Sequence, residues 1–141
     1  ILYLLRSYTV YAMSKLTETL SNQIHLRNII SCISDIEDMV DRESFESFDS
    51  DEEVRMPIYR SLMMLGIETS NIERSNFVRQ LDMTALLSMK YADFINKLGK
   101  DHYAIYNFIK NDLPFFKCSI QKYLLSLSQL EHSSRPKEFL A

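Results

Sequence analysis

The sequence predicts an all-α protein, built as a compact bundle of short helices with an N-terminal helical hairpin and a C-terminal helix. Apolar residues make up 46% of the 141 residues, which is enough for a hydrophobic core. Only two Gly and three Pro are present, and this scarcity disfavours a turn-rich β fold. Apolar residues also recur at the three- and four-residue spacing of an amphipathic helix through most of the chain.

Residues 1–42 are expected to form the helical hairpin. Its first helix, over residues 2–20, is predicted by the apolar series Leu5, Tyr8, Ala12, Leu16 and Leu20. Further apolar residues flank this series, so we expect a wide buried arc on the helix (Leu4, Val10, Tyr11 and Met13). Ser21 and Asn22 are expected to break the helix and to cap the next one.

The second helix of the hairpin, over residues 23–42, has the most regular pattern in the chain. Its apolar residues are spaced three and four apart, as in a coiled coil about two heptads long: Leu26, Ile29, Ile33, Ile36 and Val40. One interpretation is that this stripe packs against the first helix or the rest of the domain. The alternative is that it pairs two copies of the chain.

An acidic linker is predicted over residues 43–53, where six carboxylates and no basic residue occur within a chain of net charge −3. Such a charge density resists burial. Two aromatic residues, Phe45 and Phe48, are unusual in this setting. They either attach the linker to the bundle or form a docking motif.

Short helices are predicted over residues 54–112. Pro57 is expected in the first turn of a helix that ends at Leu65, with Gly66 just beyond its end. Ser70 and Glu73 have the spacing of a capping box. Gly99 is expected to end a later helix, and Asp101 to cap the last one.

The remaining residues, 113–141, are predicted to form a C-terminal helix and a polar tail. Pro114 is expected to bend the chain. A helix over residues 116–130 follows from the apolar residues Ile120, Tyr123, Leu124, Leu127 and Leu130. From Glu131 onward the sequence is polar, and we expect a frayed end.

Several short motifs within residues 54–112 resemble a sterile alpha motif (SAM) domain. Residues 58–62 (Ile-Tyr-Arg-Ser-Leu) and 65–68 (Leu-Gly-Ile-Glu) resemble the first helix of the family and its exit. The later motifs are Phe77, residues 86–89 (Leu-Leu-Ser-Met), the pairs 93–94 and 98–99, and residues 102–105 (His-Tyr-Ala-Ile). The chain departs from the family in lacking a Trp near the first helix and in having an early Pro114 after the last one.

Resemblance to SAM domains implies a non-catalytic protein–protein interaction module that associates head to tail. A mid-loop surface on one copy would meet an end-helix surface on another, and such a contact can propagate into oligomers. The acidic side of this contact would draw on Glu68, Glu73, Asp82 and Asp93, and the basic side on Lys97, Lys100, His102 and Tyr103. The expected partner is therefore another protein or a second copy.

The sequence carries no pattern typical of an enzyme, so we expect no catalytic, cofactor-binding or metal-binding residues. The three histidines lie far apart and lack partners at metal-ligand spacing, and no Gly-rich phosphate loop is present. No apolar run reaches the length of a membrane span. Cys32 and Cys118 are expected to be reduced and packed, which suits a cytoplasmic or nuclear protein, although a single disulfide is the alternative.

Two other functions fit an all-α chain of this length. The first is a Bcl-2-like regulator, viral or host, that binds a partner's amphipathic helix in a groove; the Asn-Trp-Gly-Arg stretch usual in that family is absent. The second is binding of an RNA hairpin through a modest basic face that includes Arg55, Arg60, Lys97, Lys100 and Lys110. The balance of charges is not typical of nucleic-acid binding, and no small-molecule substrate is expected.

Overall fold

The structure, a computed structural model, describes residues 1–72 and 101–134, and within them the all-α prediction is confirmed. No β-strand occurs in these two ranges. The elements are α1 (Leu2–Asp41), α2 (Phe45–Ser50), α3 (Glu52–Ser70), α7 (His102–Asn107), the π-helical η1 (Phe108–Asp112) and α8 (Leu113–Ser134). The side chains of residues 15–19 and 130–134 are not described.

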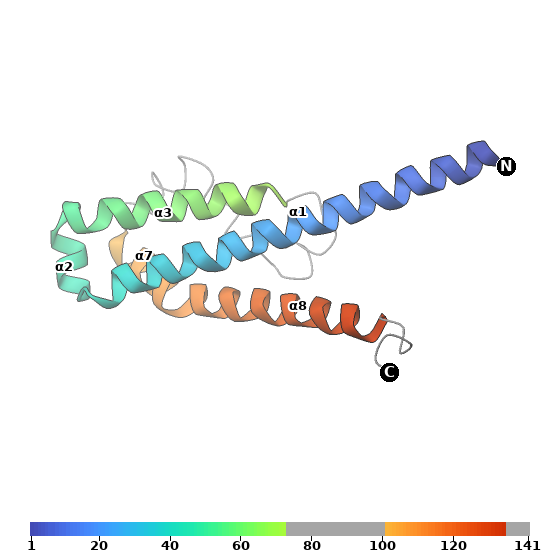
Figure 1. Ribbon diagram of the computed structural model, residues 1–141. Coiled ribbons are helices and arrows are strands. Elements are labelled where there is room, and N and C mark those ends of the chain that lie inside the picture. The colour runs from blue at the N-terminus through green and yellow to red at the C-terminus, as the bar shows by residue number, and fades with distance from the viewer. Residues whose placement is uncertain (73–100, 135–141) are drawn as a thin grey trace.

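The long helix α1 lies between α3 and α8 and contacts both (Figure 1). Both α3 and α8 run antiparallel to α1, while α2 and α7 close the end of the bundle where α1 finishes. The N-terminal part of α1 extends well beyond the ends of α3 and α8. The described part of the chain therefore consists of a three-helix bundle and a projecting helical arm.

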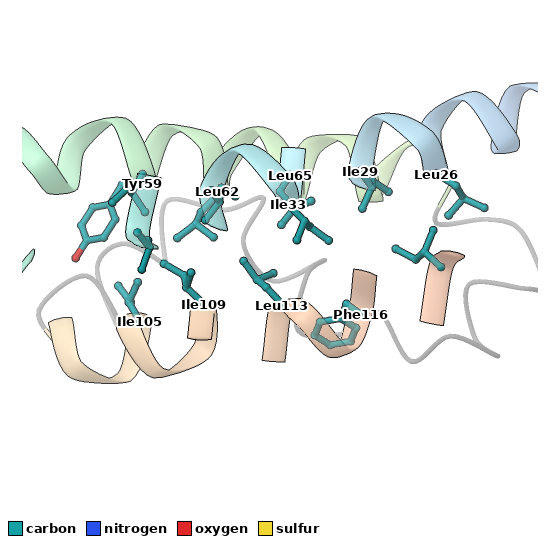
Figure 2. Packing of buried hydrophobic residues seen from close by; sticks show 14 of the residues in the cluster. Leu26, Ile29, Ile33, Tyr59, Leu62, Leu65, Ile105, Ile109, Leu113 and Phe116 are labelled. Atoms are coloured by element: carbon teal, nitrogen blue, oxygen red, sulfur yellow. The ribbon is translucent and has the colours of Figure 1, made fainter. Parts of the chain in front are cut away.

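The core of the bundle is built on the apolar stripe of α1. We call Leu26, Ile29, Ile33, Ile36 and Val40 the buried seam, and all five side chains are 0% exposed. The seam packs against apolar residues of α3, α7, η1 and α8 (Figure 2), chiefly Ile58, Leu62, Leu65, Ile105, Ile109, Leu113, Phe116 and Ile120. Helices of the same chain thus cover the whole apolar stripe. No part of the buried seam is exposed for contact with a second copy.

The prediction of a hairpin over residues 1–42 is wrong, because α1 continues through Ser21 and Asn22 as a single helix of 40 residues. Ser and Asn are only a few tenths of a kcal/mol poorer than Ala inside a helix, so they permit a break without enforcing one. Asn22 is also buried at the point where the bundle begins. Packing that begins at Asn22 therefore favours a continuous helix over a break at this pair.

The predicted linker, residues 43–53, is instead a helical corner of the bundle. Ser44 caps α2 by accepting a hydrogen bond from the Ser47 N–H at 3.1 Å. Phe48 is fully buried in the core, and Phe45 packs against the core's edge. The interpretation in which these two aromatic residues attach the acidic segment to the bundle is confirmed.

The predicted helix over residues 57–65 is too short at both ends. Asp51 caps α3 by accepting from the Glu53 N–H at 2.9 Å, and the helix then runs through Pro57 and Gly66 to Ser70. Pro57 removes one backbone hydrogen bond and Gly66 raises the entropic cost of helix formation. Burial of the α3 face that contains Ile58, Leu62 and Leu65 offsets both penalties.

The predicted capping box lies partly outside the described residues. Ser70 is the last residue of α3, and its hydroxyl donates to the Ile67 carbonyl at 2.7 Å instead of opening a new helix. Glu73 is not described, nor is the helix end predicted at Gly99. The cap predicted at Asp101 is confirmed, since its carboxylate accepts from the Ala104 N–H at 3.0 Å.

No boundary separates residues 112 and 113, because the chain is helical without interruption from His102 to Ser134. Pro114 has no N–H to donate, and the turn before it is π-helical, with the Leu113 N–H bonded to the Phe108 carbonyl five residues back. π-Helical turns are rare, and most of them occur as single-turn bulges within α-helices. The run changes direction here (Figure 1), in agreement with the bend predicted at Pro114.

Candidate functional site

Five of the eight residues predicted to form the head-to-tail contact lie outside the described residues: Glu73, Asp82, Asp93, Lys97 and Lys100. The other three lie at opposite ends of α3. Glu68 is in its last turn, and His102 and Tyr103 begin α7 beside α2. The head-to-tail contact stays a prediction.

Glu68 and His102 both have partners within the chain. The Glu68 carboxylate lies 2.9 Å from His25 Nδ1 on α1, with both side chains about three-quarters covered. His102 Nδ1 lies 2.8 Å from the Asp49 carboxylate of α2. These contacts join helices of the bundle, so neither side chain is held ready for a second molecule.

An aromatic cluster surrounds the α2 corner. Phe45 packs edge-on against Tyr103, with ring centroids 5.4 Å apart, and against Tyr106 at the same distance. Phe48 contacts Tyr59 and Tyr106 on the inner side. Edge-to-face pairs at these distances are typical of packed cores. This cluster therefore accounts for several of the tyrosines as structural residues.

The described members of the predicted basic face are also largely engaged. Lys110 Nζ is 2.8 Å from the Asp41 carboxylate and lies over the Tyr106 ring. The Arg55 guanidinium donates to the backbone carbonyls of Phe48, at 2.9 Å, and Asp49. Arg60 is exposed on α3. The contacts of Arg55 and Lys110 hold α2 and η1 in place, and they give no support to a nucleic-acid surface.

Among the described residues, the largest concentration of exposed apolar side chains lies on the first thirteen, which we call the arm. Nine of these residues are large and apolar, and each is at least 59% exposed: Ile1, Leu2, Tyr3, Leu4, Leu5, Tyr8, Val10, Tyr11 and Met13. Contiguous apolar surface of this extent marks binding sites on folded proteins. The sequence showed the wide apolar arc, but we expected it to be buried, and that expectation is wrong.

One face of the arm continues the buried seam. Tyr8 precedes Leu26 by 18 residues, which is five turns of an α-helix, and Leu4 precedes Val40 by ten turns. The side chains of Leu4 and Tyr8 therefore point in the same direction around α1 as the residues that pack on α3 and α8. In the bundle this face is covered by helices, whereas along the arm it is exposed.

The arm carries very little charge. Arg6 is the only charged side chain in residues 1–14, and it lies two residues from both Leu4 and Tyr8, which places it on the opposite face of the helix. A shallow, open hollow follows a third side, where the small Ser7 and Ser14 lie among larger side chains (Tyr3, Arg6, Val10 and Tyr11). The arm thus offers apolar contact area with little electrostatic selectivity.

The two thiols differ in their surroundings. Both cysteines are free, as predicted, but only Cys32 is packed, and Cys118 is exposed on α8. The Cys32 thiol donates to the Ser61 carbonyl at 3.3 Å. Burial raises the pKa of Cys32 to about 11, and the carboxylates of Asp35 and Glu68 act in the same direction. Cys32 is therefore a structural residue and a poor nucleophile.

We expect Cys32 to react with a disulfide reagent such as Ellman's reagent on the order of 100-fold more slowly than an ordinary thiol at pH 8, because so little of it is thiolate. Its rate should rise as the pH approaches the raised pKa. Cys118→Ser should remove the fast phase, and Cys32→Ser should leave that phase intact. Two equal fast phases, or no free thiol in the folded protein, would contradict this assignment.

No protein-family model, curated protein or solved structure matches this chain. Among the described residues, no helix is sufficiently long and apolar to cross a membrane.

Proposed function

We propose that this chain is a non-catalytic protein–protein interaction module that binds a partner's helix along the arm of α1. The observation that carries the proposal is the cluster of nine large apolar side chains, each at least 59% exposed, within thirteen residues. The surface differs from the one implied by the SAM resemblance, but the class of function is the same.

The exposed apolar area is large enough to offset the cost of association. Burying five such side chains contributes roughly 7–15 kcal/mol, which is comparable with the cost of about 4–15 kcal/mol for bringing two molecules together. Most of each large apolar side chain of the arm is exposed, and short isolated helices are marginally stable in water. A partner would therefore both cover the arm and stabilise its conformation.

A helix is the partner shape that the arm favours. Leu4 and Tyr8 continue the face through which α1 already packs against α3 and α8. Apolar residues at this spacing interdigitate with the side chains of another helix. A membrane surface fits less well, since interfacial helices normally have a polar face rich in Lys and Arg and the arm has only Arg6.

A labelled amphipathic peptide of three heptads, with leucine at the two core positions, tests the proposal by fluorescence anisotropy. We expect the protein to bind this peptide and Leu4→Glu to weaken binding about tenfold or more, because a carboxylate would be buried. Leu125→Glu is the matched control: the same substitution at an exposed site on α8 should have no effect.

The same variants should be tested with lipid vesicles containing anionic headgroups. No sedimentation of the protein with vesicles is expected. If the peptide does not bind, or if Leu4→Glu and Leu125→Glu weaken its binding equally, the arm is not the binding surface. Vesicle binding that Leu4→Glu removes, without peptide binding, would replace the proposal by a membrane-surface function.

A further inference from the structure

We infer that the partner of the arm is a second copy of this chain, and that the two arms pair antiparallel about a two-fold axis near Tyr8. This inference rests on the proposed function, because it names the occupant of the same surface. Three features of the described residues support it: the exposed area, the position of the charge, and the geometry of the bundle behind the arm.

The exposed area suits a dimer of two identical arms. Each large side chain of the arm offers on the order of 100 Å², so pairing that covers about half of each arm removes roughly 1,000 Å² in total. That is about the smallest interface expected of a specific complex. One arm against another therefore reaches this area without help from the rest of the molecule.

Charge does not oppose the pairing of like surfaces. In an interface through Leu4 and Tyr8, the Arg6 side chains of the two copies would both face solvent, because Arg6 lies on the opposite side of the helix. Residues 1–14 contain no carboxylate, so the arm has no acidic group to attract a basic partner. An uncharged apolar face is complementary to itself, and an isologous contact between two such faces closes as a dimer.

The positions of α3 and α8 in the bundle determine whether the two arms pair parallel or antiparallel. Beyond Asn22 the face shared by Leu4, Tyr8 and the buried seam is covered by α3 and α8. In a parallel pair on this face, the second α1 would run into the space that these helices fill (Figure 1). In an antiparallel pair, the two bundles lie at opposite ends of the paired arms, so neither bundle blocks the contact.

We place the axis close to Tyr8. This side chain is 72% exposed and lies on the face of the arm that continues the buried seam. The two Tyr8 side chains then meet across the axis. The two Leu4 residues would be about 12 Å apart along the helices, which is too far for a disulfide.

Light scattering coupled to size-exclusion chromatography tests whether two copies of the chain associate. We expect the mass of a dimer for the wild-type chain and of a monomer for Tyr8→Glu. Tyr103→Glu, the same substitution at a comparably exposed tyrosine on α7, should remain a dimer. A monomer only for Tyr103→Glu, or an open series of larger oligomers, would overturn the inference in favour of the head-to-tail contact.

Cysteine cross-linking in a Cys118→Ser background tests the orientation. We expect Tyr8→Cys to form a disulfide-linked dimer on oxidation, and Leu4→Cys and the background itself to form none. Cross-linking at both positions would indicate a parallel pair and overturn the antiparallel arrangement. A wild-type monomer that still binds the leucine peptide would overturn only the self-pairing, whereas a monomer that binds no peptide would contradict the proposed function as well.

Discussion

Replacing Phe48 with alanine is expected to lower the free energy of unfolding by about 3–5 kcal/mol, measured by urea denaturation with circular dichroism. Phe48 is fully buried although it lies in the most acidic segment of the chain. Its ring contacts Tyr59, Tyr106 and His102, so it joins α2 to both α3 and α7. Its removal leaves a cavity at the corner where these three helices meet.

Phe45→Ala is the matched control for this change. Phe45 is only partly buried, three residues earlier on the same short helix, and contacts Tyr103 and Tyr106 from outside the core. We expect Phe45→Ala to lower the free energy of unfolding by at most about half as much as Phe48→Ala does, because the site can relax toward solvent. Equal losses for the two variants would show that α2 is not anchored through Phe48.

Replacing Ile33 with alanine is expected to cost about 2–5 kcal/mol in the same measurement. Ile33 lies at the middle of the buried seam and is 0% exposed. The cavity would open between α1 and the helices on either side of it, where the surrounding side chains have little room to collapse.

Ile24→Ala provides the comparison on the same helix. Ile24 is 59% exposed, and alanine is a better helix former, so the change should stay within about 0.5 kcal/mol. If Ile24→Ala were as destabilising as Ile33→Ala, the face of α1 that packs in the bundle would have been assigned wrongly.

The sequence predicted the buried seam well because its pattern is both strict and strongly apolar. Five residues from Leu26 to Val40 alternate in spacing between three and four, and only a helix with one covered face produces that pattern. The caps at Ser44 and Asp51 carried weaker signals, since Ser and Asp occur throughout that segment.

Residues that commonly mark helix boundaries predicted the helix ends poorly. Pro57, Gly66 and the pair Ser21 and Asn22 all resemble helix boundaries, yet α1 and α3 run through them. Each such residue costs from a few tenths of a kcal/mol to about 3 kcal/mol, and a buried helix face can offset that amount. Whether it does so depends on tertiary neighbours, which the local sequence does not specify.

The candidate binding surface could be predicted from the sequence only in part. The apolar arc of residues 1–13 was visible in the sequence, but periodicity alone does not say whether a helix face is covered by the same chain or by another molecule. The structure separates the two parts of α1: Ile29 and Ile33 lie inside the bundle, whereas Leu4 and Tyr8 are exposed beyond it. This division of one helix is the basis of the proposed function.

Hydrogen–deuterium exchange along α1, followed as the protein concentration is raised, tests this division most directly. We predict that the amides of residues 26–40 are protected at every concentration, because the seam is buried in the monomer. The amides of residues 2–13 should exchange rapidly in dilute protein and become protected at high concentration or on addition of the leucine peptide. Protection of residues 2–13 that does not depend on concentration or peptide would contradict the account.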